Sequence, residues 1–260
     1  MRLVPLRCGA EIGDLAVYDP LDPEVGTKVE IPYFAYVIEH PGGCVLFDTG
    51  AHPTLASDPV GRLGPAAAAF DVRLGPEDDV VSRLGAAGFD PSDISHVVQS
   101  HLHYDHAGGI EFFPRAAFLV QKRELQFAHW PAVYQRDLYV RADFCHPVQW
   151  VELAGKRDIF GDGRVVVFPT PGHTPGHQSL LVQLDDEAVI LGGDMAYSSV
   201  KMRQRRIPGV VWCPDRLVES WERVEALQAR HGARLILTHE LDLDAVHAVP
   251  KPQTEEGARA

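Results

Sequence analysis

Residues 100–109 read S-H-L-H-Y-D-H-A-G-G and are the most informative stretch of the chain. A short apolar run precedes them, which is typical of a buried strand. His101 and His103 lie two positions apart, and side chains at i and i+2 of an extended chain point the same way, so both imidazoles can bind one metal ion. Asp105 and His106 follow where the chain turns toward a helix, and they can face a second ion. The stretch therefore predicts a metal site at the end of a strand.

Three more polar side chains each follow a short apolar run that is predicted to be a strand. They are His173 after residues 165–168, Asp194 after residues 188–191, and His239 after residues 235–237. With the residues above they supply imidazoles and carboxylates but no thiolate. Such a ligand set suits zinc, and also iron, cobalt or manganese. Ligands shared between two ions leave coordination positions open, which is typical of a catalytic rather than a structural site.

The order of the predicted elements indicates an α/β fold. Strands followed by helices occur in both halves of the chain, which predicts an α/β sandwich of two similar halves. Residues 33–39 and 44–47 read as a hairpin, and residues 51–75 as a long irregular loop. The clearest helix spans residues 215–230, with Asp215 as its N-cap. Further helices are predicted at 77–87 and 122–129, and further strands at 94–99, 117–120, 148–153, 164–168, 179–184, 188–191 and 235–237. We expect a single domain over residues 1–250, followed by a polar tail over residues 251–260.

Charge and cysteine content limit the class of partner and the compartment. The chain has 260 residues and a net charge of −12, from 24 Lys and Arg against 36 Asp and Glu. This surplus argues against binding to nucleic acid or to an anionic membrane. No apolar run approaches the roughly 18 residues that a membrane-spanning helix requires, and no secretory leader is visible. Four cysteines far apart disfavour a disulfide framework and fit a reducing compartment. We therefore expect a cytoplasmic protein with a small-molecule substrate, and a homodimer is left open.

The metal-site residues, taken in order, resemble the metallo-β-lactamase superfamily. The motifs that carry the resemblance are Asp48-Thr49-Gly50, His101-x-His103-x-Asp105-His106, His173, Asp194 and His239. The resemblance implies an αββα sandwich with two mixed β-sheets flanked by helices. It also implies that one ion is held by His101, His103 and His173, that a second is held by Asp105, His106 and His239, and that Asp194 bridges the two.

A closer resemblance is to the N-acyl homoserine lactonases of that superfamily. It rests on T-P-G-H-T-P-G-H-Q-S-L at residues 170–180 and on D-M-A-Y at residues 194–197, which puts Tyr197 three residues after Asp194. In that family a tyrosine at this position polarises the lactone carbonyl. The resemblance implies two divalent ions, zinc above all, and attack on the lactone by a hydroxide that bridges them. Tyr197 would then be catalytic, and Asp105 would be both a ligand and a proton shuttle.

Other readings stay open at this point. One alternative is a hydrolase that opens a different lactone. Another is a glyoxalase II-type thioesterase, which Tyr197 disfavours. The diiron redox proteins of the fold have Glu where this chain has His103, so His103 favours hydrolysis. The apolar residues of 51–72, among them Leu63 and Phe70, either cover an acyl chain or pack on the body, with Trp130 and Tyr134 as outside candidates. Two smaller questions concern Asp48, which either orients a ligand imidazole or is a turn residue, and the basic run 201–206, expected to be solvated surface.

Overall fold

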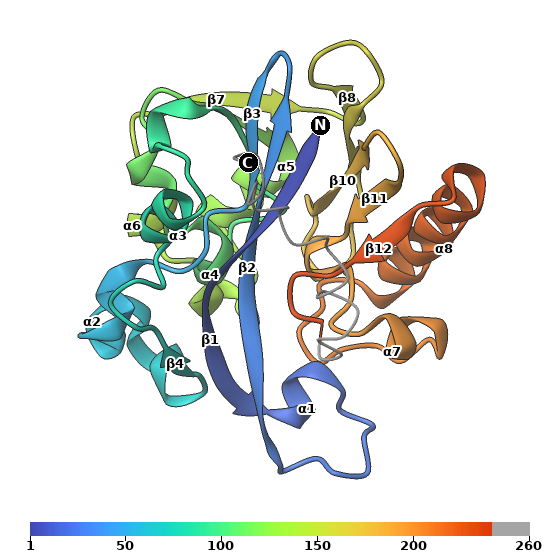
Figure 1. The fold of residues 1–260 in the computed structure, drawn as a ribbon. Helices are drawn as coiled ribbons and strands as arrows, with labels where there is room; N and C mark the ends of the chain where they lie inside the picture. The colour runs from blue at the N-terminus through green and yellow to red at the C-terminus, as the bar shows by residue number, and fades with distance from the viewer. Residues whose placement is uncertain (241–260) are drawn as a thin grey trace, which may run out of the picture.

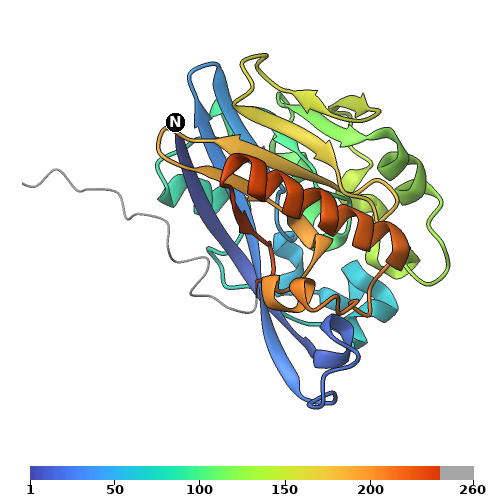
Figure 2. The same ribbon diagram turned by 90° about the vertical axis from the view of Figure 1, so that its right-hand side faces the viewer.

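Two β-sheets lie face to face, with helices on the outer face of each (Figures 1 and 2). The structure is a computed structural model that describes residues 1–240. The predicted αββα sandwich is confirmed. The predicted domain end at residue 250 and the tail 251–260 lie outside the described residues, so that division stays a prediction.

The first sheet has seven strands in the order β4-β1-β2-β3-β5-β6-β7. Strands β4, β1, β2 and β3 are antiparallel neighbours, whereas β3, β5, β6 and β7 run parallel. The carboxyl end of β5 therefore opens at one edge of a parallel region, and residues 100–109 begin there. The bounds are β1 (Arg2–Asp14), β2 (Lys28–His40), β3 (Gly43–Phe47), β4 (Asp71–Arg73), β5 (Ile94–Val98), β6 (Ala117–Gln121) and β7 (Gln149–Leu153).

The second sheet has five strands in the order β12-β11-β10-β9-β8. Only β11 and β12 are parallel neighbours, and β10 is antiparallel to both β9 and β11. Strands β9, β11 and β12 therefore run in the same direction, and the segments that carry His173, Asp194 and His239 leave the sheet at one edge. The bounds are β8 (Arg157–Asp158), β9 (Val165–Pro169), β10 (Gln178–Gln183), β11 (Ala188–Leu191) and β12 (Arg234–Ile236).

The helices are short except for α8, which crosses the outer face of the second sheet (Figure 2). The α-helices are α1 (Leu15–Tyr18), α2 (Pro59–Leu63), α3 (Val80–Ala86), α4 (Tyr104–Ala107), α5 (Lys122–His129), α6 (Arg141–Phe144), α7 (Ser199–Arg203) and α8 (Pro214–His231). The 3-10 helices are η1 (Pro53–Ala56), η2 (Gly64–Ala68), η3 (Pro91–Asp93), η4 (Ile110–Phe112), η5 (Arg136–Leu138) and η6 (Gly193–Met195). No helix among residues 1–240 combines the length and the apolar character needed to cross a membrane.

Alternation along the strands builds a core on each side of each sheet. In β9, Val165 and Val167 pack between the two sheets, whereas Val166 and Phe168 pack against α8. In β2, Ile38 packs between the sheets and its neighbour Val37 packs with the helices of the first sheet. Because successive side chains of a strand point to opposite faces, a strand that is buried on both faces reads as a continuous apolar run.

Two local predictions were wrong, and one strand was missed. Residues 51–75 are not irregular, because they form η1, α2, η2 and the edge strand β4. The last helix begins one residue earlier than predicted, with Cys213 at its N-cap position, so Asp215 lies in the first turn. Strand β1 was not predicted, because its apolar residues are interrupted by Arg7, Gly9 and Glu11.

Removing the large side chain that joins α8 to the second sheet should destabilise the protein. Trp221 is fully buried, and its indole N–H donates to the carbonyl oxygen of Met195 at 2.5 Å. We expect Trp221→Ala to lower the free energy of unfolding by about 3–5 kcal/mol, since a large core cavity is left. Trp130→Ala is the matched control, because Trp130 is 86% exposed. Urea unfolding followed by circular dichroism measures both, and equal losses would contradict this account of the core.

Candidate metal centre

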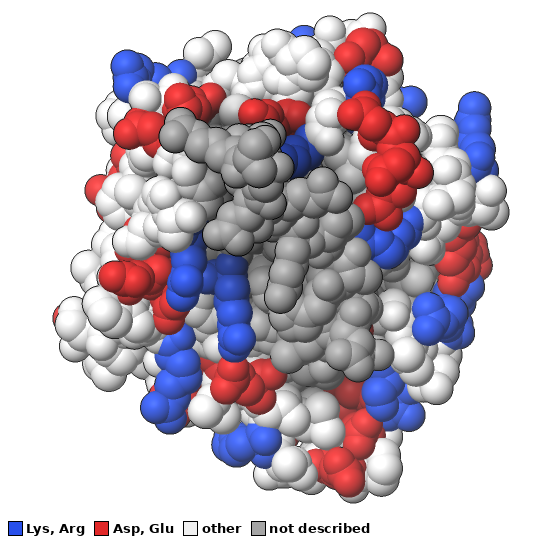
Figure 3. All heavy atoms as spheres, viewed as in Figure 1, with Lys and Arg blue, Asp and Glu red and all other residues white. Residues whose placement is uncertain are grey.

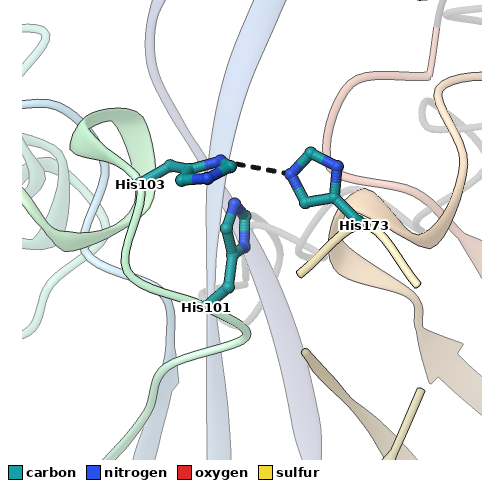
Figure 4. A group of neighbouring side chains, drawn as sticks. All are labelled: His101, His103 and His173. Carbon is teal, nitrogen blue, oxygen red and sulfur yellow. Dashed lines mark hydrogen bonds between the residues drawn. The ribbon is translucent and has the colours of Figure 1, made fainter. Parts of the chain in front are cut away.

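Three imidazoles from the two sheets converge in the interior. His101 and His103 follow β5 of the first sheet, and His173 follows β9 of the second (Figure 4). One nitrogen from each ring lies within 4.8 Å of the others. His173 Nε2 and His103 Nδ1 are 3.2 Å apart, and all three side chains are buried. The structure thus brings together the residues predicted to hold the first ion.

A second group lies beside the first. His239 Nε2 is 3.2 Å from His106 Nε2 and 3.2 Å from Asp105 Oδ2. Asp194 lies between the two groups, since its Oδ1 is 3.2 Å from Nε2 of both His106 and His239, and its Oδ2 is 3.6 Å from His173 Nε2. All seven predicted ligand residues therefore meet in one place.

The donor atoms fit divalent cations. His101 Nε2 is buried and has no hydrogen-bond partner among the described residues, which is costly for a polar atom unless something else satisfies it. Neutral imidazoles and carboxylates are ligands of zinc and of the neighbouring transition metals. These seven residues could hold two such ions, and their role as ligands stays a prediction.

The outer ring nitrogens are anchored, which fixes the direction of each ring. His173 Nδ1 lies 3.1 Å from the carbonyl oxygen of Val210, and His239 Nδ1 lies 2.8 Å from that of Pro32. A carbonyl oxygen can only accept, so each Nδ1 donates its proton and each Nε2 is free to bind a cation. The rings are therefore set for metal binding by backbone groups.

Asp48 does the same for His106. Its Oδ2 lies 2.9 Å from His106 Nδ1, and its carboxylate also accepts the backbone N–H and the hydroxyl of Ser100, both at 2.7 Å. Burial raises the pKa of Asp48, and the contacts with His106 and Ser100 oppose that rise. Of the two readings left open by the sequence, the structure supports the one in which Asp48 orients an imidazole.

The comparison with known families agrees with this geometry. The model of the metallo-beta-lactamase superfamily matches residues 30–239. The chain belongs to the metallo-β-lactamase superfamily. Among curated relatives, N-acyl homoserine lactonase AttM of Rhizobium radiobacter is 36% identical over 223 residues, which cover 84% of this chain and 85% of the relative. N-acyl homoserine lactonase AiiA of Bacillus thuringiensis subsp. kurstaki is 26% identical over 220 residues, with 84% of each chain covered.

Solved structures of similar fold include metallohydrolases with bound product. An N-acyl homoserine lactone hydrolase with N-hexanoyl-L-homoserine at its catalytic metal centre superposes with a TM-score of 0.84, at 23% identity, over 94% of this chain and 95% of that chain. AidC, a dizinc quorum-quenching lactonase, superposes with a TM-score of 0.70, at 16% identity, over 92% and 87% of the two chains. At these identities the likeness concerns the fold.

A buried carboxylate that the sequence analysis missed joins the two ligand loops of this superfamily member. Glu124 of α5 accepts the backbone N–H of Leu102 at 3.1 Å and that of Gly176 at 3.2 Å. It also accepts the hydroxyls of Thr174 at 2.6 Å and Tyr139 at 2.9 Å. Leu102 lies between two predicted ligands of the first sheet, and residues 174–176 follow His173 of the second. Glu124 therefore fixes the distance between the two loops that carry the predicted ligands.

His177, the second histidine of the repeat at residues 170–177, is a buried positioning residue. Its Nε2 accepts the backbone N–H of Asp194 at 3.0 Å, and its Nδ1 lies 3.1 Å from the carbonyl oxygen of Thr170. Burial and the neighbouring His173 lower the pKa of His177 to about 3, so the ring stays neutral and accepting. The repeat T-P-G-H-T-P-G-H was the signal that could have pointed to it.

The electrostatics of the two groups differ. Burial lowers the pKa values of His101, His103 and His173, which keeps these rings in the neutral form that binds metals. Burial acts the same way on His239, but Asp194 and Asp105 outweigh it and raise its pKa to about 10. The three imidazoles of the first group are thus neutral, whereas two carboxylates lie beside His239 in the second.

A cavity opens onto the metal centre. Its polar side includes Asp105, Asp194, His239 and Tyr197, and its apolar side is formed by Val17, Phe70, Leu138 and Val210. Of the predicted acyl-chain residues, Phe70 lines this cavity, whereas Leu63 packs in the core of the first sheet. Trp130 and Tyr134 are 86% and 62% exposed and do not line it.

The basic run 201–206 is paired with acidic side chains. Lys201 Nζ is 2.7 Å from Asp22 Oδ2, Arg206 Nη2 is 2.7 Å from Asp19 Oδ1, and Arg205 Nη1 is 2.7 Å from Glu225 Oε1. On the face viewed in Figure 3, outside the grey atoms, acidic and basic side chains alternate. The run is therefore part of a balanced surface.

Changing the shared carboxylate should weaken both metal positions together. We expect Asp194→Asn to lower the metal content of the purified protein from about two ions per chain, since it removes the negative charge between the two groups. Elemental analysis after dialysis measures this, with the exposed Asp186→Asn as the matched control. Active wild-type protein with one ion or none would contradict a dinuclear site.

Proposed function

We propose that this chain is a dinuclear metal-dependent hydrolase that opens the lactone ring of N-acyl homoserine lactones. The observation that carries the proposal is Tyr197, which lies in the cavity beside Asp194 and His239 at the position expected of a lactonase. The names of the curated relatives, N-acyl homoserine lactonase in each case quoted above, support it. Zinc is the proposed metal, because the ligands are imidazoles and carboxylates without a thiolate.

The surroundings of Tyr197 suit a hydrogen-bond donor. Burial raises the pKa of Tyr197 well above its ordinary value, and Asp194, Asp105 and Glu11 add to the rise. The hydroxyl therefore keeps its proton at any physiological pH. Its ring lies 5.6 Å from that of His239 and 6.1 Å from that of His173, centroid to centroid, so it is held between the two ligand groups.

The chain's own residues can perform the remaining steps of lactone opening. Two divalent ions held here would supply Lewis acidity and a water that ionises near neutral pH. Tyr197 would donate to the lactone carbonyl oxygen as negative charge develops on it. Asp105 would take up the proton released by the attacking water and return it to the ring oxygen that leaves. The apolar side of the cavity would hold the acyl chain.

Compartment and partners follow from composition. The four cysteines are free, which supports the proposal of a cytoplasmic location. The net charge of −12 supports the proposal that the protein binds neither nucleic acid nor an anionic membrane. The main alternative activity is thioester hydrolysis on the same metal centre.

Removing one hydroxyl should slow the reaction without emptying the site. We expect Tyr197→Phe to lower kcat/KM on the best lactone by up to about 2–4 kcal/mol of transition-state stabilisation, and by less where a metal shares the charge. Metal content should be unchanged. Tyr134→Phe, on the surface, is the matched control. An unchanged kcat/KM would remove the case for this role of Tyr197.

Acyl-chain length should control binding. Each methylene that enters the apolar side of the cavity should add about 0.8 kcal/mol, mainly through KM, until the cavity is full. We expect kcat/KM to rise across short, medium and long N-acyl homoserine lactones, and Phe70→Ala to flatten that rise while metal content is kept. Val133→Ala, which changes an exposed side chain, is the control.

The same series separates the alternatives. A glutathione thioester assayed beside the lactones tests the competing activity. Faster turnover of the thioester than of every lactone would refute the lactonase proposal. A flat acyl series with efficient ring opening would leave lactone hydrolysis standing and would put the acyl chain in solvent.

A further inference from the structure

A second buried carboxylate lies next to the metal centre and is not used by the mechanism above. Glu11 of β1 is 5% exposed. Its carboxylate accepts hydroxyl hydrogen bonds from Tyr18 of α1, Tyr33 of β2 at 2.6 Å, and Tyr104 of α4. Glu11 and the three tyrosines, Tyr18, Tyr33 and Tyr104, are called here the tyrosine cage.

The charge in the tyrosine cage has no cationic partner. Among residues 1–240, no Lys, Arg or His forms an ion pair with Glu11. In this described part of the chain, the hydrogen bonds of its carboxylate come from the neutral hydroxyls of the cage, and a buried charge without a cationic partner is expensive to keep. Burial and the Asp105 carboxylate raise the pKa of Glu11, and the three hydroxyls oppose the rise. Because this burial is unfavourable, packing alone does not explain why a glutamate lies here.

The cage leaves room for one more donor. A carboxylate offers about four acceptor positions, two on each oxygen. Oε2 accepts from both Tyr33 and Tyr104, whereas Oε1 accepts only from Tyr18. Oε1 therefore keeps an acceptor position for a group that is not part of the cage.

Glu11 adjoins the reacting groups. Glu11 lines the same cavity as Asp105, Asp194 and Tyr197. The ring of Tyr18 packs edge-on against that of Tyr197, with centroids 5.2 Å apart, and the ring of Tyr33 packs on that of His239 at 5.9 Å. A ligand that reaches Tyr197 is therefore beside the tyrosine cage.

We propose that Glu11 is a specificity-determining residue that accepts the amide N–H of the substrate, and so selects lactones that carry an acylamino group next to the ring carbonyl. This inference rests on the proposed function. An N-acyl homoserine lactone has a single N–H donor, on the carbon adjacent to the carbonyl that is attacked. A lactone without that donor leaves a buried acceptor unmatched, and sites that hydrogen-bond a substrate donor discriminate strongly against analogues that lack it.

The test compares two lactones that differ only in this donor. One is N-hexanoyl homoserine lactone, and the other is its ester isostere, α-hexanoyloxy-γ-butyrolactone, in which an oxygen replaces the N–H. Ring opening is followed by chromatography of the products for the metal-loaded wild type and for Glu11→Gln. In Glu11→Gln the side-chain carbonyl oxygen is expected to take the place of Oε2, where two tyrosines donate. The NH₂ group then takes the place of Oε1. This group and the substrate N–H are both donors, so they cannot form a hydrogen bond with each other.

We expect Glu11→Gln to lower kcat/KM for the amide by about tenfold or more and to leave that for the ester isostere within about twofold. Glu30→Gln is the matched control, since it makes the same change of charge at a half-exposed site on the neighbouring strand β2, where Glu30 pairs with Arg7. It should leave both substrates unchanged.

Each other outcome overturns the proposal. Equal losses on both substrates would make Glu11 a residue that only holds the cage together, and no loss on either would remove any role in turnover. If the variant does not fold, the wild type alone decides, because equal rates on the two lactones would exclude a group that reads the N–H. A wild type that opens neither lactone would refute the proposed function itself and this inference with it.

Discussion

The hydrogen bonds to Glu124 are the constraint on which the metal centre depends. The predicted ligands come from two sheets, and nothing in the regular ladders fixes one sheet edge relative to the other. Glu124 does so by accepting N–H groups from Leu102 in one ligand loop and Gly176 in the other. The approach is so close that a Cβ at position 176 would lie 2.2 Å from the backbone nitrogen of Glu124, so only glycine fits. A carboxylate suits this place because it can accept several donors at once without a competing donor of its own.

A second link between the sheets runs through Gln178. Its side-chain amide donates to the carbonyl oxygens of Gln99 at 2.8 Å and Leu119 at 3.0 Å, and its backbone N–H donates to that of Ser100 at 2.9 Å. Residues 99–100, which lead to His101, are thereby tied to Gln178, which follows the loop of His173. Buried imidazoles that repel one another when charged can stay close only if the backbone is held from outside in this way.

The sequence predicted which seven side chains would come together, because these residues belong to local patterns. His101, His103, Asp105 and His106 lie within six residues, and each of the other three follows a strand whose apolar run is visible. Glu124 could not be found this way, because K-R-E-L at residues 122–125 reads as an ordinary helical surface. Glu11 lies in a strand broken by polar residues, and its three tyrosines come from separate parts of the chain. These residues come together only when the chain folds, so the spacing of residues along the sequence does not reveal them. The elements of residues 51–75 were missed for another reason, since short helices rich in Pro, Gly and Ala show no clear period.

The site is also connected to the outer layer of the molecule. His177 accepts the backbone N–H of Asp194, and one residue further on Trp221 of α8 donates to the carbonyl oxygen of Met195. The turn η6 is therefore held from the inside by a neutral histidine and from the outside by the helix that covers the second sheet. Asp194 lies between both predicted ligand groups, so the position of this turn sets its distance to each of them. Packing of α8 against the sheet thus acts on the geometry of the metal centre through a single turn, which joins the stability of the outer layer to the chemistry of the interior.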